Sequence, residues 1–187
     1  MSLFVAVRPD ERAVDELQHA LEPVRRSPTA SVLRWQPVTQ WHITLAFLGD
    51  PDEWVEDEVA ERLRSLGAQS AVPGLQLSGA GCFGRQVLWV GLADGPSTDA
   101  LRAVQEAILP LMRGSGAVAD RRPWRPHLTI ARARGGDARG AVPLLAGYLG
   151  PDSTADEVLL VRSSGGPHPD HRVVERVGLR GPLGSIP

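Results

Sequence analysis

One short pattern occurs twice in this sequence and constrains the fold more than any other feature. The chain carries His-Ile-Thr-Leu-Ala at residues 42–46 and His-Leu-Thr-Ile-Ala at residues 127–131, 85 positions later. Each copy follows a stretch that combines Arg, Trp and Pro, at 34–37 and at 122–126. The chain has five histidines in 187 residues, so two such copies are rarely expected by chance. The repeat therefore predicts two similar lobes that each contribute one strand.

Side chains alternate along a strand, which places the histidine and threonine of each copy on the same face. By this rule the shared faces hold His42, Thr44, Ala46 and Leu48 in the first copy and His127, Thr129 and Ala131 in the second. The opposite face of the first copy carries Ile43, Leu45 and Phe47. A strand with one apolar face packs that face into the core. We therefore expect the two polar faces to line a shared cleft.

Two histidines that face one cleft can cleave a phosphodiester without a metal ion or cofactor. A neutral imidazole accepts a proton from the attacking group, and an imidazolium donates a proton to the leaving oxygen. With an ordinary pKa near 6.5, both forms coexist near neutral pH. A threonine on the same face can donate its hydroxyl to a phosphoryl oxygen. The pattern thus predicts His42 and His127 as catalytic residues and Thr44 and Thr129 as phosphate-binding residues.

The duplicated motif resembles that of the two-histidine phosphoesterase superfamily, and within it the RNA 2',3'-cyclic phosphodiesterase family, historically called RNA 2'-5' ligase. Supporting context lies at residues 3–7, 45–49, 125–126 and 131–132. The likeness covers about residues 1–160. It implies a single two-lobed, pseudo-symmetric domain over residues 1–187, in which antiparallel sheets line a central groove. It also implies hydrolysis of 2',3'-cyclic phosphate ends to 2'-phosphates.

The resemblance further implies roles for individual residues. His42 would protonate the leaving 3' oxygen and His127 would activate water, although the sequence leaves the reverse assignment open. Arg132 would add positive charge, but strict alternation turns it away from His127, so the strand would have to end or bulge before it. Arg125 is a second candidate. For each arginine, a phosphate contact and a salt bridge are both open alternatives.

Hydrophobic periodicity predicts an α+β protein, with helices outside a mainly antiparallel sheet. Strands are expected at 3–7, 32–35, 42–48, 75–77, 86–92, 127–133, 157–162 and 173–179. Helices are expected from N-caps at Asp10, at Asp52 and at Ser97 or Thr98, and the third should bend or end at Pro110. Residues 26–30 and the glycine-rich turn at 79–84 are expected to be loops. Trp35 and Trp124 precede the two motifs, and core or rim packing is favoured over base stacking for both.

Charge and composition exclude several classes of protein. The net charge of -2 excludes the broad basic surface of a protein that coats nucleic acid. Every basic residue is arginine, which excludes lysine-based catalysis. The single Cys82, the lack of a signal peptide and the lack of a long apolar run indicate a cytoplasmic protein. We expect a monomer whose partners are RNA ends or nucleoside 2',3'-cyclic phosphates, with no membrane contact.

The last third of the chain departs from the family pattern. The family typically carries an aromatic residue after a glycine-proline loop, whereas residues 165–172 read Gly-Gly-Pro-His-Pro-Asp-His-Arg. His168 and His171 lack further local ligands for zinc, which favours a polar loop. Three alternatives stay open: action on 2'-5' linked oligonucleotides, action on ADP-ribose cyclic phosphate, or a non-catalytic module that binds RNA ends. RNA 2'-5' ligation is a possible secondary activity.

Overall fold

The computed structural model describes residues 1–68, 70, 73–112, 123–165 and 169–179. The strands are β1 (Ser2–Val7), β2 (Leu33–Trp35), β3 (Ile43–Gly49), β4 (Gly74–Leu75), β5 (Leu77–Phe83), β6 (Val87–Leu92), β7 (Leu128–Ala133), β8 (Ser153–Thr154), β9 (Glu157–Ser163) and β10 (His171–Gly178). The α-helices are α1 (Glu11–Ala20), α2 (Glu22–Arg26), α3 (Glu53–Gly67), α4 (Pro96–Met112) and α5 (Val142–Leu145). Short 3₁₀ helices are η1 (Pro28–Val32), η2 (Val38–Gln40) and η3 (Ala138–Ala141). The tail from residue 180 lies outside the described residues.

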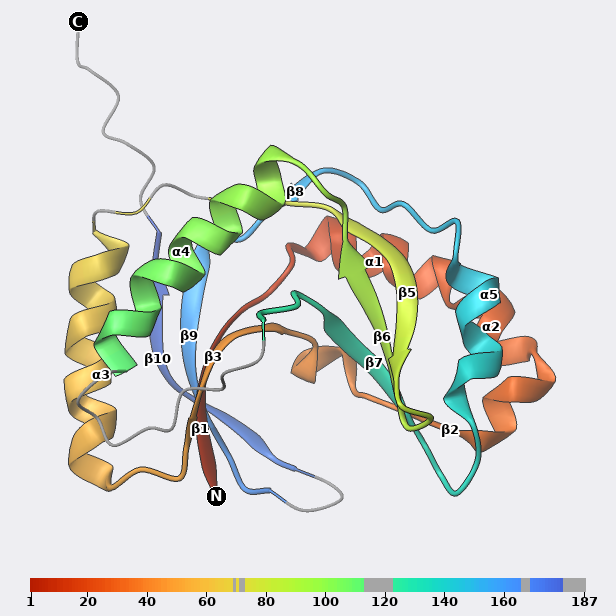
Figure 1. The fold of residues 1–187 in the computed structure, drawn as a ribbon, viewed down its shortest axis with the longest axis horizontal. Coiled ribbons are helices and arrows are strands. Elements are labelled where there is room, and N and C mark those ends of the chain that lie inside the picture. Colours follow the sequence, from red (N-terminus) through yellow and green to blue (C-terminus); the bar gives the residue numbers. More distant parts are fainter. Residues whose placement is uncertain (69, 71–72, 113–122, 166–168, 180–187) are drawn as a thin grey trace, which may run out of the picture.

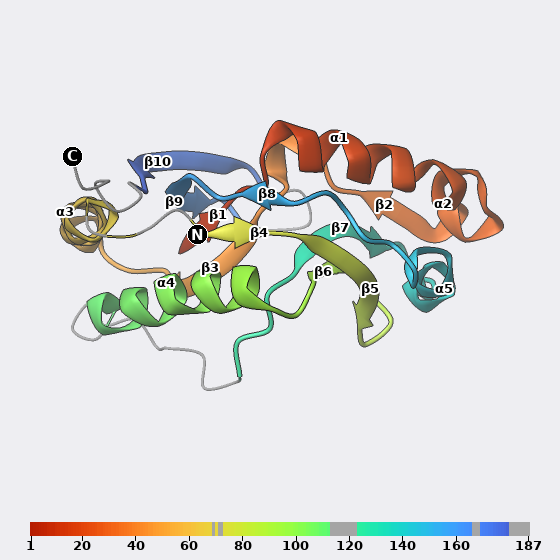
Figure 2. The ribbon, with the colours of Figure 1, turned by 90° about the horizontal axis from the view of Figure 1, so that it is seen from above.

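The main sheet has the strand order β10-β9-β1-β3-β7-β6-β5, with β2 paired to β7 and every pairing antiparallel. Its two halves meet through one residue pair, Ile43 of β3 with Leu128 of β7. Figure 1 shows the halves spreading apart, with β9 and β10 on one side and β5 and β6 on the other. The helices lie outside the strands, and Figure 2 shows α1 and α4 on opposite sides of them. The predicted two-lobed α+β architecture is confirmed.

Two of the three predicted helices, α1 and α3, begin where the sequence predicts. Asp10 is the N-cap of α1, and its Oδ1 accepts a hydrogen bond from the amide of Ala13 at 2.8 Å. Asp52 occupies the N-cap position of α3, although its side chain makes no capping hydrogen bond. Among the described residues, no helix is both long and apolar enough to cross a membrane.

The third predicted helix, α4, and the predicted loop at residues 26–30 differ from the prediction. Helix α4 begins at Pro96, before both predicted caps, because proline suits the first turn of a helix. Thr98 donates its hydroxyl to the carbonyl of Ala93 at 2.6 Å. The helix also continues past Pro110 to its end at Met112. Residues 26–30 form the end of α2 and the start of η1 rather than a loop.

The predicted glycine-rich turn is mostly strand. Strand β5 runs through Gly79 and Gly81, and the reversal of the chain comes later, where the amide of Gln86 donates to the carbonyl of Phe83 at 3.2 Å. The reason is tertiary packing. A Cβ atom added at Gly81 would lie 2.2 Å from the Trp89 ring on β6, so this glycine permits a close approach of two strands rather than a turn.

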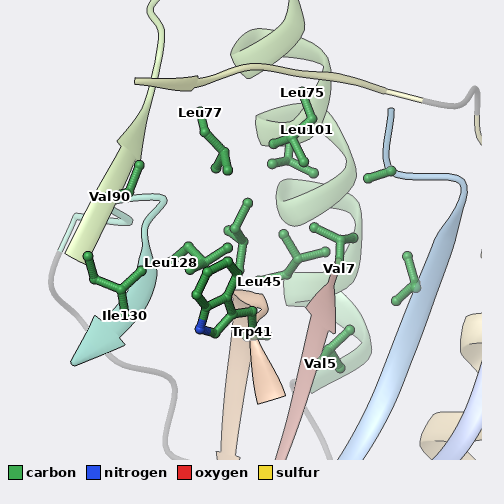
Figure 3. Close-up of a cluster of buried hydrophobic side chains, with 14 of the residues drawn as sticks. Val5, Val7, Trp41, Leu45, Leu75, Leu77, Val90, Leu101, Leu128 and Ile130 are labelled. Atoms are coloured by element: carbon green, nitrogen blue, oxygen red, sulfur yellow. The ribbon is translucent and has the colours of Figure 1, made fainter. Parts of the chain in front are cut away.

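Both halves of the sheet contribute to one hydrophobic core. Trp41, which is 2% exposed, lies directly before the first motif and packs among apolar side chains of both halves. Figure 3 shows it close to Leu45 of β3 and to Leu128 and Ile130 of β7. The aliphatic faces of the two motif strands are thus buried together, which leaves their His/Thr faces for the groove.

Candidate active site

The pairing of the two motif strands brings their polar ends together. Ile43 pairs with Leu128 in antiparallel register, and in each copy this residue stands between the histidine and the threonine of the motif. All four of these polar residues line a single cavity of about 310 Å³. The shared cleft expected from the repeat is therefore present in the structure.

Each motif strand contains a β-bulge directly after its threonine. In the pairing of β3 with β1 the extra residue is Leu45, and in the pairing of β7 with β6 it is Ile130. These positions are equivalent in the two copies, so the duplication extends to an irregularity of the backbone. A bulge shifts the alternation of side chains by one residue.

The alternation rule therefore fails beyond each threonine. Ala46, Leu48 and Ala131, which strict alternation places in the cleft, are buried in the core. Phe47 and Arg132, which the rule turns away from the cleft, line the cavity instead. The bulge that Arg132 needs in order to reach the site is present.

A backbone carbonyl orients each histidine in the same way. His42 Nδ1 lies 2.7 Å from the oxygen of Gln40, and His127 Nδ1 lies 2.8 Å from the oxygen of Arg125. A carbonyl oxygen only accepts, so Nδ1 carries the hydrogen in both rings. When each ring is neutral, its lone pair is on Nε2. That nitrogen is the atom that can accept a proton or, in the charged ring, donate one.

Aromatic rings hold both imidazoles in place. Phe4 stacks on His42 with a centroid separation of 4.8 Å, and Phe83 meets His127 edge-on at 4.7 Å. His171 from β10 contacts His42 edge-on at 5.3 Å and also lines the cavity. Packing on rings restricts rotation of the imidazoles, which favours one orientation of each Nε2.

His171 is a residue that sequence reasoning did not assign to the site. The interpretation as part of a polar loop is wrong for this residue, because it begins β10 and enters the groove. The available signal was its place after the glycine-proline segment, where the family typically carries an aromatic ring. His168 lies outside the described residues. Within the described part of the chain, His, Cys, Asp and Glu side chains form no group of three or more that could hold a metal ion.

Burial and positive charge keep both motif histidines neutral in the protein alone. Burial, together with the nearby His171 and Arg8, lowers the pKa of His42 to about 4 against an opposing backbone hydrogen bond. Burial also lowers the pKa of His127, and the charges of Arg125 and Arg132 act in the same direction, against the hydrogen bond to the Arg125 carbonyl. An anion bound between the rings would oppose these effects and raise both pKa values.

The other sequence candidates have structural contacts. Trp124 Nε1 donates to the carbonyl of Thr44 at 2.9 Å. This hydrogen bond links the segment before the second motif to strand β3. Trp35 packs against the core, as predicted. The Arg125 guanidinium lies over the Trp89 ring, 5.8 Å from its centroid. Arg125 is not among the described residues that line the cavity, although its carbonyl orients His127.

Comparison with known proteins finds one family and several named relatives. The family model described as the 2'-5' RNA ligase superfamily matches residues 6–167. The chain is 38% identical over 109 residues to an RNA 2',3'-cyclic phosphodiesterase of Geobacillus stearothermophilus, a match that covers 56% of this chain and 33% of that protein. It is 32% identical over 99 residues to a protein of the same name from Aeropyrum pernix, covering 51% and 54%. The chain thus matches about a third of the first relative and about half of the second.

Solved structures share the fold over nearly the whole chain. The crystal structure of TT0787 from Thermus thermophilus is 27% identical with a TM-score of 0.69, and the match covers 97% of this chain and 99% of that one. Escherichia coli LigT, in a crystal structure with 3'-AMP, is 21% identical with a TM-score of 0.73, covering 95% and 97%. At that identity the LigT likeness concerns the fold alone.

Proposed function

The chain belongs to the 2'-5' RNA ligase superfamily, and from this premise we propose that it is a phosphodiesterase that hydrolyses RNA 2',3'-cyclic phosphate ends to 2'-phosphates. One observation carries the proposal: two histidines with Nδ1 held by backbone carbonyls share one cavity with two threonines. The names of the Geobacillus and Aeropyrum relatives support it. We propose that the chain acts as one two-lobed domain, because each half supplies one His/Thr pair. We also propose a cytoplasmic location, which suits a chain with a single cysteine.

The proposed reaction needs only two proton transfers. His127 Nε2 takes a proton from water as the water oxygen bonds to phosphorus, and His42 Nε2–H gives a proton to the 3' oxygen as its bond to phosphorus breaks. The phosphate stays on the 2' oxygen. Each histidine ends in the protonation state that the other had, and exchange with solvent resets both. The negative charge of the bound phosphate raises the pKa of His42 enough for it to carry its proton.

The threonines and one arginine stabilise the charge of the transition state in this proposal. Thr44 and Thr129 line the same cavity as the two histidines and donate their hydroxyls to the non-bridging phosphoryl oxygens. Arg132 lines the same cavity and adds a positive charge that suits a phosphate. No step in this scheme uses a metal ion.

A chelator experiment tests the proposal directly. Protein treated with EDTA should still open nucleoside 2',3'-cyclic phosphates, because the two imidazoles move both protons. Chromatography against the 2'- and 3'-phosphate standards should give only the 2'-phosphate. Activity that EDTA abolishes and divalent metal restores would contradict the proposal, and so would a 3'-phosphate product.

The pH profile is expected to have its maximum for kcat/KM on the acidic side of 6.5. This constant reports the free enzyme, in which the pKa of His42 is about 4 and that of His127 is also lowered. Below the lower pKa the base is protonated, and above the higher pKa the acid has lost its proton, so the rate falls on both sides. The kcat optimum should lie at higher pH, since bound phosphate raises both values.

A variant of His171 tests whether the pKa of His42 sets the acidic limb of the kcat/KM profile. In His171→Asn, the loss of a nearby positive charge should raise the pKa of His42, measured by NMR titration of its ring protons. The acidic limb of the kcat/KM profile should move to higher pH with it, an effect that a purely structural role of His171 would not produce. A kcat/KM maximum above pH 7 in the wild-type protein would contradict the prediction.

A further inference from the structure

A second cavity shares part of its lining with the first. It has a volume of about 450 Å³, within the range of small-ligand sites, and its lining shares Gln36, Gln40 and Pro169 with the motif cavity. Gln40 Nε2 donates to the carbonyl of Pro169 at 3.0 Å, which fixes this shared wall. The two cavities therefore lie next to each other along this wall.

Arginines lead from one cavity into the other. Arg132 lines the motif cavity, and Arg34 and Arg134 line the second. In the pairing of β2 with β7, Arg34 lies directly opposite Arg132. Arginines gathered along two paired strands form a row of positive charge, which suits a ligand with several negative charges. Asp170 also lines the second cavity and contributes one negative charge.

The second cavity combines these charges with apolar surface. Trp35, Pro37 and Pro169 contribute to its lining beside the two arginines. Apolar rings next to guanidinium groups match a nucleotide, whose base packs on the rings while its phosphate takes hydrogen bonds from arginine. A purely anionic ligand such as free phosphate would leave the apolar part of the cavity unused.

Other parts of the motif cavity's lining have a different character. Ser2, Phe47, Ser163 and Gly165 also line it, and none of them is charged. A polyanion that enters the motif cavity therefore finds the next positive charges only in the direction of Arg34 and Arg134, among the residues that line the two cavities.

We propose that the second cavity binds the nucleotide on the 5' side of the cyclic phosphate, so that the preferred substrate is a single-stranded oligoribonucleotide rather than a mononucleotide. This inference rests on the proposed function. The 3'-terminal nucleotide lies with its cyclic phosphate between the histidines, and the preceding phosphate lies along the row formed by Arg132, Arg34 and Arg134. The same row would give little advantage to a small cyclic phosphate that ends inside the motif cavity.

The test compares kcat/KM for a trinucleotide ending in a 2',3'-cyclic phosphate with that for the matching nucleoside 2',3'-cyclic phosphate. The trinucleotide should be favoured by about tenfold or more, the effect of one or two added charged hydrogen bonds. Arg34→Gln and Arg134→Gln should each reduce this ratio by about five- to tenfold. Arg64→Gln removes the same charge from α3, where Arg64 pairs with Glu61 and Glu175, and should leave the ratio unchanged.

Salt dependence provides a second readout that needs no variant. Each phosphate contact with single-stranded nucleic acid adds about 0.7 to the slope of log affinity against log salt, so the slope should be steeper for the trinucleotide. Arg34→Lys keeps the charge and should keep the slope. Equal kcat/KM and equal slopes for the two substrates would overturn this inference while leaving the proposed function intact. Failure to hydrolyse either substrate would instead overturn the proposed function.

Discussion

Replacing His42 or His127 by alanine is expected to lower kcat for cyclic phosphate hydrolysis by about 10²- to 10⁴-fold, because each ring carries one proton transfer. The two transfers belong to one step, so the double variant should lose far less than the product of the two single losses. Initial rates on a nucleoside 2',3'-cyclic phosphate measure both effects. Circular dichroism spectra show whether each variant is folded.

His19 provides a matched control for these variants. It is exposed on α1, where its Nδ1 lies 2.9 Å from the carbonyl of Asp15, and it does not line the motif cavity. His19→Ala should retain wild-type activity. Full activity in a folded His42→Ala or His127→Ala protein would rule out paired-histidine catalysis.

Thr44→Val and Thr129→Val are each expected to lower kcat by about 10²- to 10³-fold, the usual cost of removing one donor to a developing anionic charge. Valine keeps the β-branched shape, so the strand and its bulge should be preserved. Steady-state kinetics should show that kcat and kcat/KM fall together, since the hydroxyl acts mainly in the transition state.

An exposed strand threonine is the control for the second pair of variants. Thr154 on β8 pairs with Gly74 and is exposed, so Thr154→Val should leave kcat and KM unchanged. If Thr44→Val or Thr129→Val raised KM while kcat stayed the same, the hydroxyl would contribute to ground-state binding only, and the proposed role in the transition state would be wrong.

Local pattern was enough to predict most of the framework. The main strands, the caps at Asp10 and Asp52 and the two motif strands follow from side-chain periodicity and short-range chemistry, and they lie close to the predicted positions. The errors occur where a distant contact decides the local structure. Gly81 is glycine because Trp89 packs against it, and nothing near it in the sequence indicates that contact.

The site was predictable in part, because side-chain alternation also applies to the two motif strands. The repeat places His42, Thr44, His127 and Thr129 on polar strand faces, and their catalytic roles stay predictions that the variants above test. Phe47 was placed on the wrong face, because a bulge depends on how β3 pairs with β1 rather than on the residues of β3 alone.

By itself, then, the sequence determined that two copies of one strand carry equivalent polar side chains, since alternation along a strand is a property of the backbone. Only the tertiary structure decided what stands beside those side chains. His171 contacts His42, and Arg34 pairs with Arg132, because segments far apart along the chain come together. Such pairings depend on how whole lobes bury their apolar faces. Local periodicity does not predict which distant segments will pair.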